Sequence, residues 1–138
     1  EPLLGGADAK ALLQQRECSG YQPLHIWCKQ GEDGLAKRAL EAGAAVGALT
    51  FAGHAPLHVA AEFGHAACSL LLLQHSAAVD ARMPHGATAL YTASQRGYVE
   101  VAEVLLKHGA AVDAAVKEGA TPLYVASWFG RVAAARLL

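Results

Sequence analysis

His54, His58, His65 and Cys68 lie within fifteen residues of one another. Imidazole nitrogens and thiolate sulfurs are the ligands that zinc takes in proteins, and a zinc site requires them to converge tetrahedrally. The repeat described below instead assigns His54 to a loop, His58 to the start of a helix and His65 to a turn. We therefore expect these side chains to lie in separate parts of a repeat and not to form a metal site.

Nucleophilic catalysis is the second chemistry to consider. The sequence contains no G-x-S-x-G motif, P-loop or dinucleotide-binding fingerprint. Cys28, Ser94 and Ser127 share one repeat position at which small residues allow helices to pack closely, so packing explains them better than catalysis does. Asp113 and Glu118 lie in a loop, where solvated charge is the simplest explanation. We expect no enzyme activity and no cofactor.

The elements that position these residues repeat every 33 residues. The segments GYQPLH, GHAPLH, GATALY and GATPLY begin at residues 20, 53, 86 and 119. A fixed period of this length indicates a stack of small units, each too thin to bury its own apolar face and each stabilised by its neighbours. Any function must then lie on a surface that the units share.

Each unit reads as helix, turn, helix and loop. Thr88 is suited to cap the first helix, and prolines stand at the first helical position of the other units. These prolines are Pro23, Pro56 and Pro122. Glycines 33 residues apart, from Gly31 to Gly130, are expected to end that helix with a positive φ. The second helix carries core leucines such as Leu72 and Leu105, and residues 110–120 should project as a hairpin-like finger.

These motifs resemble the ankyrin repeat family. Residues 119–130 read GATPLYVASWFG, close to the family pattern G-x-T-P-L-H-x-A-A-x-x-G, and the likeness covers residues 20–138. The resemblance implies an all-α fold, an ankyrin-repeat solenoid of stacked helix-turn-helix units with hairpin-like finger loops. It also implies a scaffold that binds proteins and has no chemistry of its own.

The resemblance divides the chain into units of about 17–49, 50–82, 83–115 and 116–138, the last incomplete. Residues 1–19 do not follow the period and are expected to form an N-terminal capping segment, with Asp8 starting a helix that packs Leu12 or Leu13 against the first unit. A frayed linker is the alternative for this segment. We expect the chain to be part of a longer repeat protein.

Departures from the family pattern carry predictions. The family pairs a threonine with a histidine in each unit, but His25 and His58 here lack that threonine, and Thr88 and Thr121 are followed by tyrosines. Units one and two should therefore be less stable than a consensus array, and Ala55→Thr should raise the melting temperature. Ser76 stands where a glycine usually ends the second helix. Arg38 stands where the next two units have Leu71 and Val104, so that helix of unit one should be less buried.

Composition narrows the class of partner and the cellular setting. A formal charge of −1 gives no basic footprint for nucleic acid. The apolar runs are far shorter than the roughly 20 residues that a membrane-spanning helix needs. Three cysteines cannot all pair within one chain, which favours a reducing, intracellular setting, cytoplasmic or nuclear. We expect a monomer.

The resemblance places partner contacts on a concave face made by the finger tips and the exposed side of the first helices. A protein or peptide is the expected partner, with exposed aromatic side chains as anchors. The alternative for the last two aromatic residues is that they pack on neighbouring units. A second functional class is an intramolecular regulatory or targeting module for a catalytic, channel or degradation domain in a longer chain. The predicted contact residues are Tyr21, Phe51, His54, Glu62, Phe63, His85, Gln95, Arg96, Trp128 and Phe129.

Overall fold

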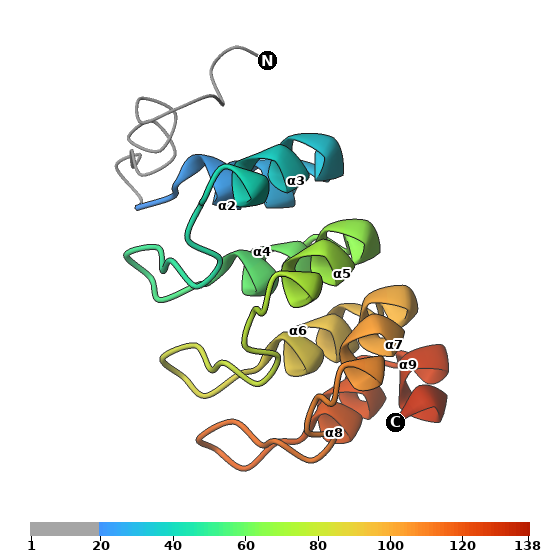
Figure 1. Cartoon of the computed structure of the whole chain (residues 1–138). Helices are drawn as coiled ribbons and strands as arrows, with labels where there is room; N and C mark the ends of the chain where they lie inside the picture. The colour runs from blue at the N-terminus through green and yellow to red at the C-terminus, as the bar shows by residue number, and fades with distance from the viewer. Residues whose placement is uncertain (1–19) are drawn as a thin grey trace.

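The computed structural model describes residues 20–138, which form four pairs of helices stacked along one direction (Figure 1). The pairs are α2 (Pro23–Gln30) with α3 (Asp33–Glu41), α4 (Pro56–Glu62) with α5 (Ala66–Gln74), α6 (Ala89–Arg96) with α7 (Val99–Lys107), and α8 (Pro122–Trp128) with α9 (Val132–Leu137). We refer to these pairs as units one to four.

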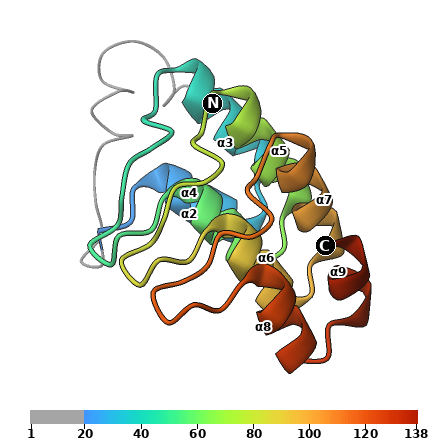
Figure 2. The ribbon, with the colours of Figure 1, turned by 90° about the horizontal axis from the view of Figure 1, so that it is seen from below.

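The helices form two parallel rows. Helices α2, α4, α6 and α8 contact one another in that order and make the inner row, and α3, α5, α7 and α9 make the outer row (Figure 2). The connecting loops project together to one side of the stack (Figure 1). This confirms the predicted all-α solenoid of helix-turn-helix units; residues 20–138 contain no strand.

The inner helices begin as the sequence predicts. Pro23, Pro56 and Pro122 each occupy the first turn, where no backbone N–H is required. The hydroxyl oxygens of Thr88 and Thr121 each accept a hydrogen bond of 3.2 Å from the N–H three residues later. Threonine caps of this kind are typically worth about 1 kcal/mol.

Units one and two use histidine at the same helix end. Nδ1 of His25 accepts the N–H of Gln22 at 3.1 Å, and Nδ1 of His58 accepts the N–H of Ala55 at 3.0 Å. Nε2 of His58 donates to the carbonyl oxygen of Ala81 at 2.7 Å. The histidines of units one and two thus bond the N–H of the residue before the helix, whereas the threonines of units three and four bond the N–H of the third helical residue. The lower stability of units one and two stays a prediction.

The turn between the helices of a unit needs glycine for two reasons. Gly31, Gly64 and Gly97 have φ near 77°, in the left-handed region that other residues adopt at a cost of about 1–2 kcal/mol. A Cβ atom at these glycines would also lie within 2.9 Å of a side chain of the following unit. These side chains are His65, Tyr98 and Arg131. The glycines therefore set both the reversal of the chain and the spacing of the units.

The core runs continuously through the units. Leu24, Leu57 and Leu90 of the inner helices are at most 3% exposed, and Leu72 and Leu105 of the outer helices are fully buried. Small residues fill the space between them; four alanines of α4 and α6 and both Cys28 and Ser94 are completely buried. Small side chains at these positions allow the helices of neighbouring units to approach closely.

The outer helix of unit one is more exposed than α5 and α7, as predicted. Arg38 is exposed, whereas Leu71 and Val104 are partly buried. Five of the nine residues of α3 are exposed, against three of nine in α5 and three of nine in α7.

The finger loops close in the same way in three consecutive units. The N–H groups of Thr50, Met83 and Val116 donate to the carbonyl oxygens of the residues four positions later, at 2.8–2.9 Å. The tip residues Gly53, Gly86 and Gly119 have φ between 84° and 95°. This confirms the hairpin-like fingers and places Gly119 in the turn.

No helix among the described residues is long and apolar enough to cross a membrane. The predicted capping helix that begins at Asp8 and packs Leu12 or Leu13 lies outside the described residues.

Candidate protein-binding surface

A polar hollow of about 140 Å³ lies between units two and three, on the side of the inner helices and fingers. It contains five of the ten predicted contact residues. The lining residues are His54, His58, Glu62, Met83, His85, Tyr91, Thr92, Gln95 and Arg96.

Two kinds of element position these five side chains. His54 and His85 come from consecutive fingers, whereas Glu62, Gln95 and Arg96 come from the last turns of α4 and α6. The backbone of His54 is fixed because its N–H donates to Oγ1 of Thr50 at 3.2 Å and its carbonyl accepts from the N–H of Thr50 at 2.9 Å. The hollow is therefore built on ordered backbone.

Glu62 and Arg96 form an ion pair across the hollow, with 3.4 Å between Oε1 and the guanidinium nitrogen Nη2. The two side chains are 30% and 49% exposed. Water screens such a pair, and pairs of this type contribute about 0–1 kcal/mol to stability. A partner could therefore break this pair and bind Glu62 or Arg96 with its own charged groups at a small cost in free energy.

His58 forms the buried floor of the hollow. Burial lowers the pKa of His58 below its ordinary value, with the backbone hydrogen bond to Ala81 acting in the opposite direction and His54 and His85 adding to the lowering. Its Nδ1 accepts one hydrogen bond and its Nε2 donates another, which requires the neutral ring protonated at Nε2. His58 is thus a structural residue with both nitrogens engaged.

A second cluster lies beside the hollow and joins units one and two. The ammonium group of Lys29 lies 5.4 Å from the ring centroid of Phe63 and 5.9 Å from that of Tyr21. Both distances are within the range of cation–π attraction. Phe63 is nevertheless 40% exposed, so much of its ring is accessible to a partner. Phe63 follows Glu62 directly, and the aromatic cluster therefore continues into the polar hollow.

The three remaining predicted residues do not line the hollow. Phe51 lies in the finger between units one and two and is 72% exposed. Trp128 and Phe129 lie at the end of α8 and are 73% and 48% exposed. The Trp128 ring stacks on Tyr124, with centroids 6.3 Å apart and planes at 19°.

The predicted contact set omits Lys29, Tyr91 and Tyr124, although the repeat register places Lys29 on the concave face. Tyr91 and Tyr124 could have been found, because they stand 33 and 66 residues after His58, whose ring bonds to the carbonyl of Ala81 in the next finger. The role of Lys29 depends on contacts with two different units, which no local pattern specifies.

The residues considered for metal binding and catalysis have other contacts. His65 donates from Nε2 to the carbonyl of Lys29 at 2.9 Å, and no three His, Cys, Asp or Glu side chains among residues 20–138 are grouped to hold a metal ion. The hydrogen bond with Cys68 and burial both raise the pKa of the Cys28 thiol. Cys28 is completely buried, so it is a packing residue and not an activated nucleophile.

Comparison with known families agrees with the geometry. A family model described as ankyrin repeats (3 copies) matches residues 1–83 and again residues 76–138. The chain belongs to the ankyrin repeat family. Ankyrin repeats are generally protein–protein interaction modules and are generally non-catalytic. A comparison with curated proteins finds no match.

Proposed function

We propose that this ankyrin repeat chain binds a protein or peptide partner on its finger side and performs no chemistry of its own. The contact surface consists of the hollow between units two and three and the aromatic cluster of Tyr21, Lys29 and Phe63 beside it. Phe51, Trp128 and Phe129 extend the surface along the stack. Units begin near residues 17, 50, 83 and 116 in this proposal, with residues 1–19 as an N-terminal cap.

The observation that carries the proposal is the exposure of Phe63 at the edge of a polar hollow. Phe63 leaves an aromatic surface in water beside a charged pair, Glu62 and Arg96, that is also accessible. Aromatic residues and arginine are the side chains that most often dominate the affinity of protein interfaces. A partner would cover Phe63 with an apolar side chain and hydrogen-bond to the groups in the hollow.

Preorganisation supports binding on this face. The N–H of Lys117 donates to the carbonyl of His85 at 3.2 Å, and Arg82 donates to the carbonyls of Gly86 and Ala115 at 3.1 and 2.6 Å. The bonds to His85 and Ala115 join the fingers of neighbouring units, and the bond to Gly86 orders a single finger. A surface that is already ordered loses less affinity to ordering when a partner binds.

The same proposal includes an intracellular, monomeric protein whose partner is not a nucleic acid. Cys28 and Cys68 lie together as buried thiols, an arrangement suited to a reducing compartment. The near-zero formal charge does not favour phosphate backbones.

The test compares two double variants that remove matched side chains from opposite sides of the stack. Phe63→Ala/Arg96→Ala removes one aromatic and one cationic side chain from the finger side. Leu70→Ala/Lys107→Ala removes an exposed apolar and a cationic side chain from the outer helices, where Leu70 is 38% exposed. Circular dichroism first establishes that both variants are folded.

Affinity capture from cell extract, followed by titration calorimetry with the captured protein, then measures binding. We expect the finger-side variant to bind at least about tenfold more weakly, which corresponds to the loss of one hot-spot residue, and the control to bind like the wild type. Equal binding by both variants would show that the partner uses another surface.

A further inference from the structure

Hydrogen-bond donors outnumber carboxylates in the hollow between units two and three. Glu62 carries the one carboxylate among the described lining residues. An imidazole ring has at least one N–H in either protonation state, and guanidinium groups are donors only. The side chains that offer an N–H or O–H group are His54, His85, Tyr91, Gln95 and Arg96. This composition favours a ligand group that only accepts hydrogen bonds.

Arg96 retains most of its capacity to bind such a group. Among residues 20–138, its guanidinium bonds to Glu62 through Nη2 alone, at 3.4 Å. Charge-assisted bonds of this type are usually about 2.7–2.9 Å long, and a guanidinium has five N–H groups that can hold a carboxylate in a paired geometry. The Arg96 side chain is also 49% exposed. A second carboxylate can therefore reach Arg96 from solvent.

The floor of the hollow carries no group that competes for this ligand. His58 and Thr92 are buried there and already donate to the carbonyls of Ala81 and Thr88. Burial raises the pKa of the Tyr91 phenol, and the nearby Glu118 and Tyr124 raise it further, so the phenol keeps its proton at neutral pH. An anionic group is therefore bound by the exposed side of the hollow.

Cationic side chains also surround the hollow. The finger tips, residues 49–54, 82–87 and 115–120, and the last turns of the inner helices carry four cations and two carboxylates. They are Lys29, Arg82, Arg96 and Lys117 against Glu62 and Glu118. Asp80 and Asp113 lie at the finger bases, where Oδ1 of Asp80 accepts a backbone N–H of the next finger at 2.8 Å. Because the whole chain has a formal charge of −1, the positive excess is local and attracts anionic segments over about 10 Å.

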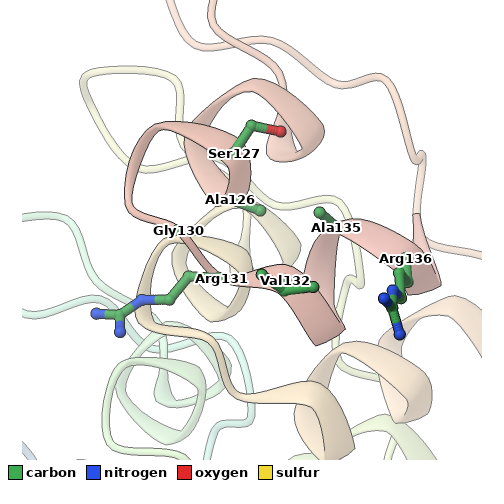
Figure 3. A pocket seen from close by; sticks show the side chains of 7 residues that line it. All are labelled: Ala126, Ser127, Gly130, Arg131, Val132, Ala135 and Arg136. Carbon is green, nitrogen blue, oxygen red and sulfur yellow. The ribbon is translucent and has the colours of Figure 1, made fainter.

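The larger hollow between α8 and α9 lacks such a convergence of polar groups. It has a volume of about 340 Å³, and its cationic side chains, Arg131 and Arg136, lie on opposite sides of it (Figure 3). Nε of Arg131 already donates to the carbonyl of Gln95 at 3.0 Å. The remaining lining residues are Ala126, Ser127, Gly130, Val132 and Ala135. A charged group is therefore better bound between units two and three.

We propose that the hollow between units two and three binds an acidic side chain, aspartate or glutamate, of a partner peptide segment. This inference rests on the proposed function, because it names the chemistry of the partner at the same surface. The carboxylate bonds to the guanidinium of Arg96, and an apolar side chain nearby in the same segment covers Phe63. A hollow of about 140 Å³ corresponds to the volume of four or five water molecules at about 30 Å³ each, which accommodates one such side chain.

Glu62 distinguishes an acidic partner from a basic one. Its carboxylate repels a second carboxylate and engages Nη2 of Arg96. A cationic side chain would instead pair with Glu62. Removing the charge of Glu62 should therefore strengthen the binding of an acidic segment and weaken that of a basic segment. The exposed pair adds little to stability, so the substitution leaves the fold intact.

The experiment selects a displayed library of random peptides on the folded 138-residue chain. Peptides that bind the wild type more strongly than Phe63→Ala use the proposed surface. Each is synthesised with a fluorescent label, and again with its acidic residues replaced by asparagine or glutamine. Fluorescence anisotropy measures Kd for the wild type, Arg96→Gln and Glu62→Gln. Lys107→Gln and Glu103→Gln make the same charge changes at exposed positions of α7 and serve as matched controls, and circular dichroism establishes that all variants are folded.

We expect the Phe63-dependent peptides to contain an acidic residue close to an apolar one. Arg96→Gln should weaken their binding about tenfold, as should amidation of that acidic residue, and the two changes together should have hardly more effect than either alone. Glu62→Gln should strengthen binding about twofold to fivefold. The two α7 variants should bind like the wild type.

The outcomes separate this inference from the proposed function. If no peptide prefers the wild type to Phe63→Ala, the proposed function is wrong and the inference falls with it. Phe63-dependent peptides without an acidic residue, or with weaker binding to Glu62→Gln, would overturn the inference alone. Additive effects of Arg96→Gln and amidation would place the acidic residue outside the hollow, and equal effects of the α7 variants would assign the result to net charge; both would also overturn it.

Discussion

Replacing Ser76 with glycine should make the stack more stable. Ser76 has a φ of 70° and is the one non-glycine residue with positive φ among residues 20–138. Gly43 and Gly109 occupy the same position in the neighbouring units, with φ of 97° and 85°. All three residues end an outer helix with the same hydrogen bonds. In unit two, for example, the N–H of Ala77, the residue after Ser76, donates to the carbonyl of Leu72 at 3.0 Å.

The magnitude follows from two opposing effects. The left-handed conformation costs a residue with a Cβ atom about 1–2 kcal/mol, which glycine avoids. Glycine also makes the unfolded chain more flexible, which lowers stability by about 0.4–1 kcal/mol. The net gain is therefore about 0.5–1 kcal/mol. For a domain of this size that corresponds to a rise of about 2–4 °C in melting temperature.

Thermal unfolding followed by circular dichroism measures the effect, with two controls. Ser76→Ala keeps the Cβ atom and should bring no gain. Gly109→Ser should lower the melting temperature by a similar amount, without a steric clash, because no atom lies within 4 Å of a Cβ atom built at Gly109. A melting temperature that falls or stays constant in Ser76→Gly would refute the assignment of strain to this residue.

Two further predictions concern the start of the inner helices. Ala55→Thr should add the cap that Thr88 provides in unit three and raise the unfolding free energy by about 1 kcal/mol. Thr88→Ala should lower the unfolding free energy by a similar amount, and urea unfolding compares the two variants. Destabilisation by Ala55→Thr would contradict the capping geometry. Because burial lowers the pKa of His58, the unfolded state binds the proton more tightly, so the unfolding free energy should decrease as the pH falls through about 6.5 and level off below the folded-state pKa. The double variant Ala55→Thr/His58→Tyr, which copies unit three, should show a weaker decrease between pH 7.5 and 5.5, and an unchanged pH dependence would assign the effect to other groups.

Most of the fold could be predicted from the sequence because each structural requirement recurs at the same position in every unit. Prolines mark the starts of three inner helices, and glycines mark the turns and finger tips. Such requirements are local, since they concern φ or the absence of an N–H within a few residues. The capping of units one and two was less predictable, because the partners of the histidine rings include carbonyls from the next finger, such as that of Ala81.

The candidate surface was predictable only in part, for a physical reason. The repeat register predicts that His54, Glu62, His85, Gln95 and Arg96 share one side, and these five residues line one hollow in the structure. Register does not specify which long side chains reach across to the next unit. The position of Lys29 between two aromatic rings depends on the neighbouring unit and not on local sequence.

Comparison of equivalent positions explains why a regular stack can recognise a particular partner. The leucines at positions 24, 57 and 90 are identical and at most 3% exposed, because a constant unit spacing leaves room for one shape of side chain. One turn further along the same helices, the equivalent residues are Lys29, Glu62, Gln95 and Trp128, which differ in charge, polarity and size. Their side chains are at least partly exposed, and no packing requirement restricts them. The buried positions therefore determine the fold, while these four positions and their neighbours vary without altering the stack. In the proposed function, this variation gives each unit a different contact surface for a partner.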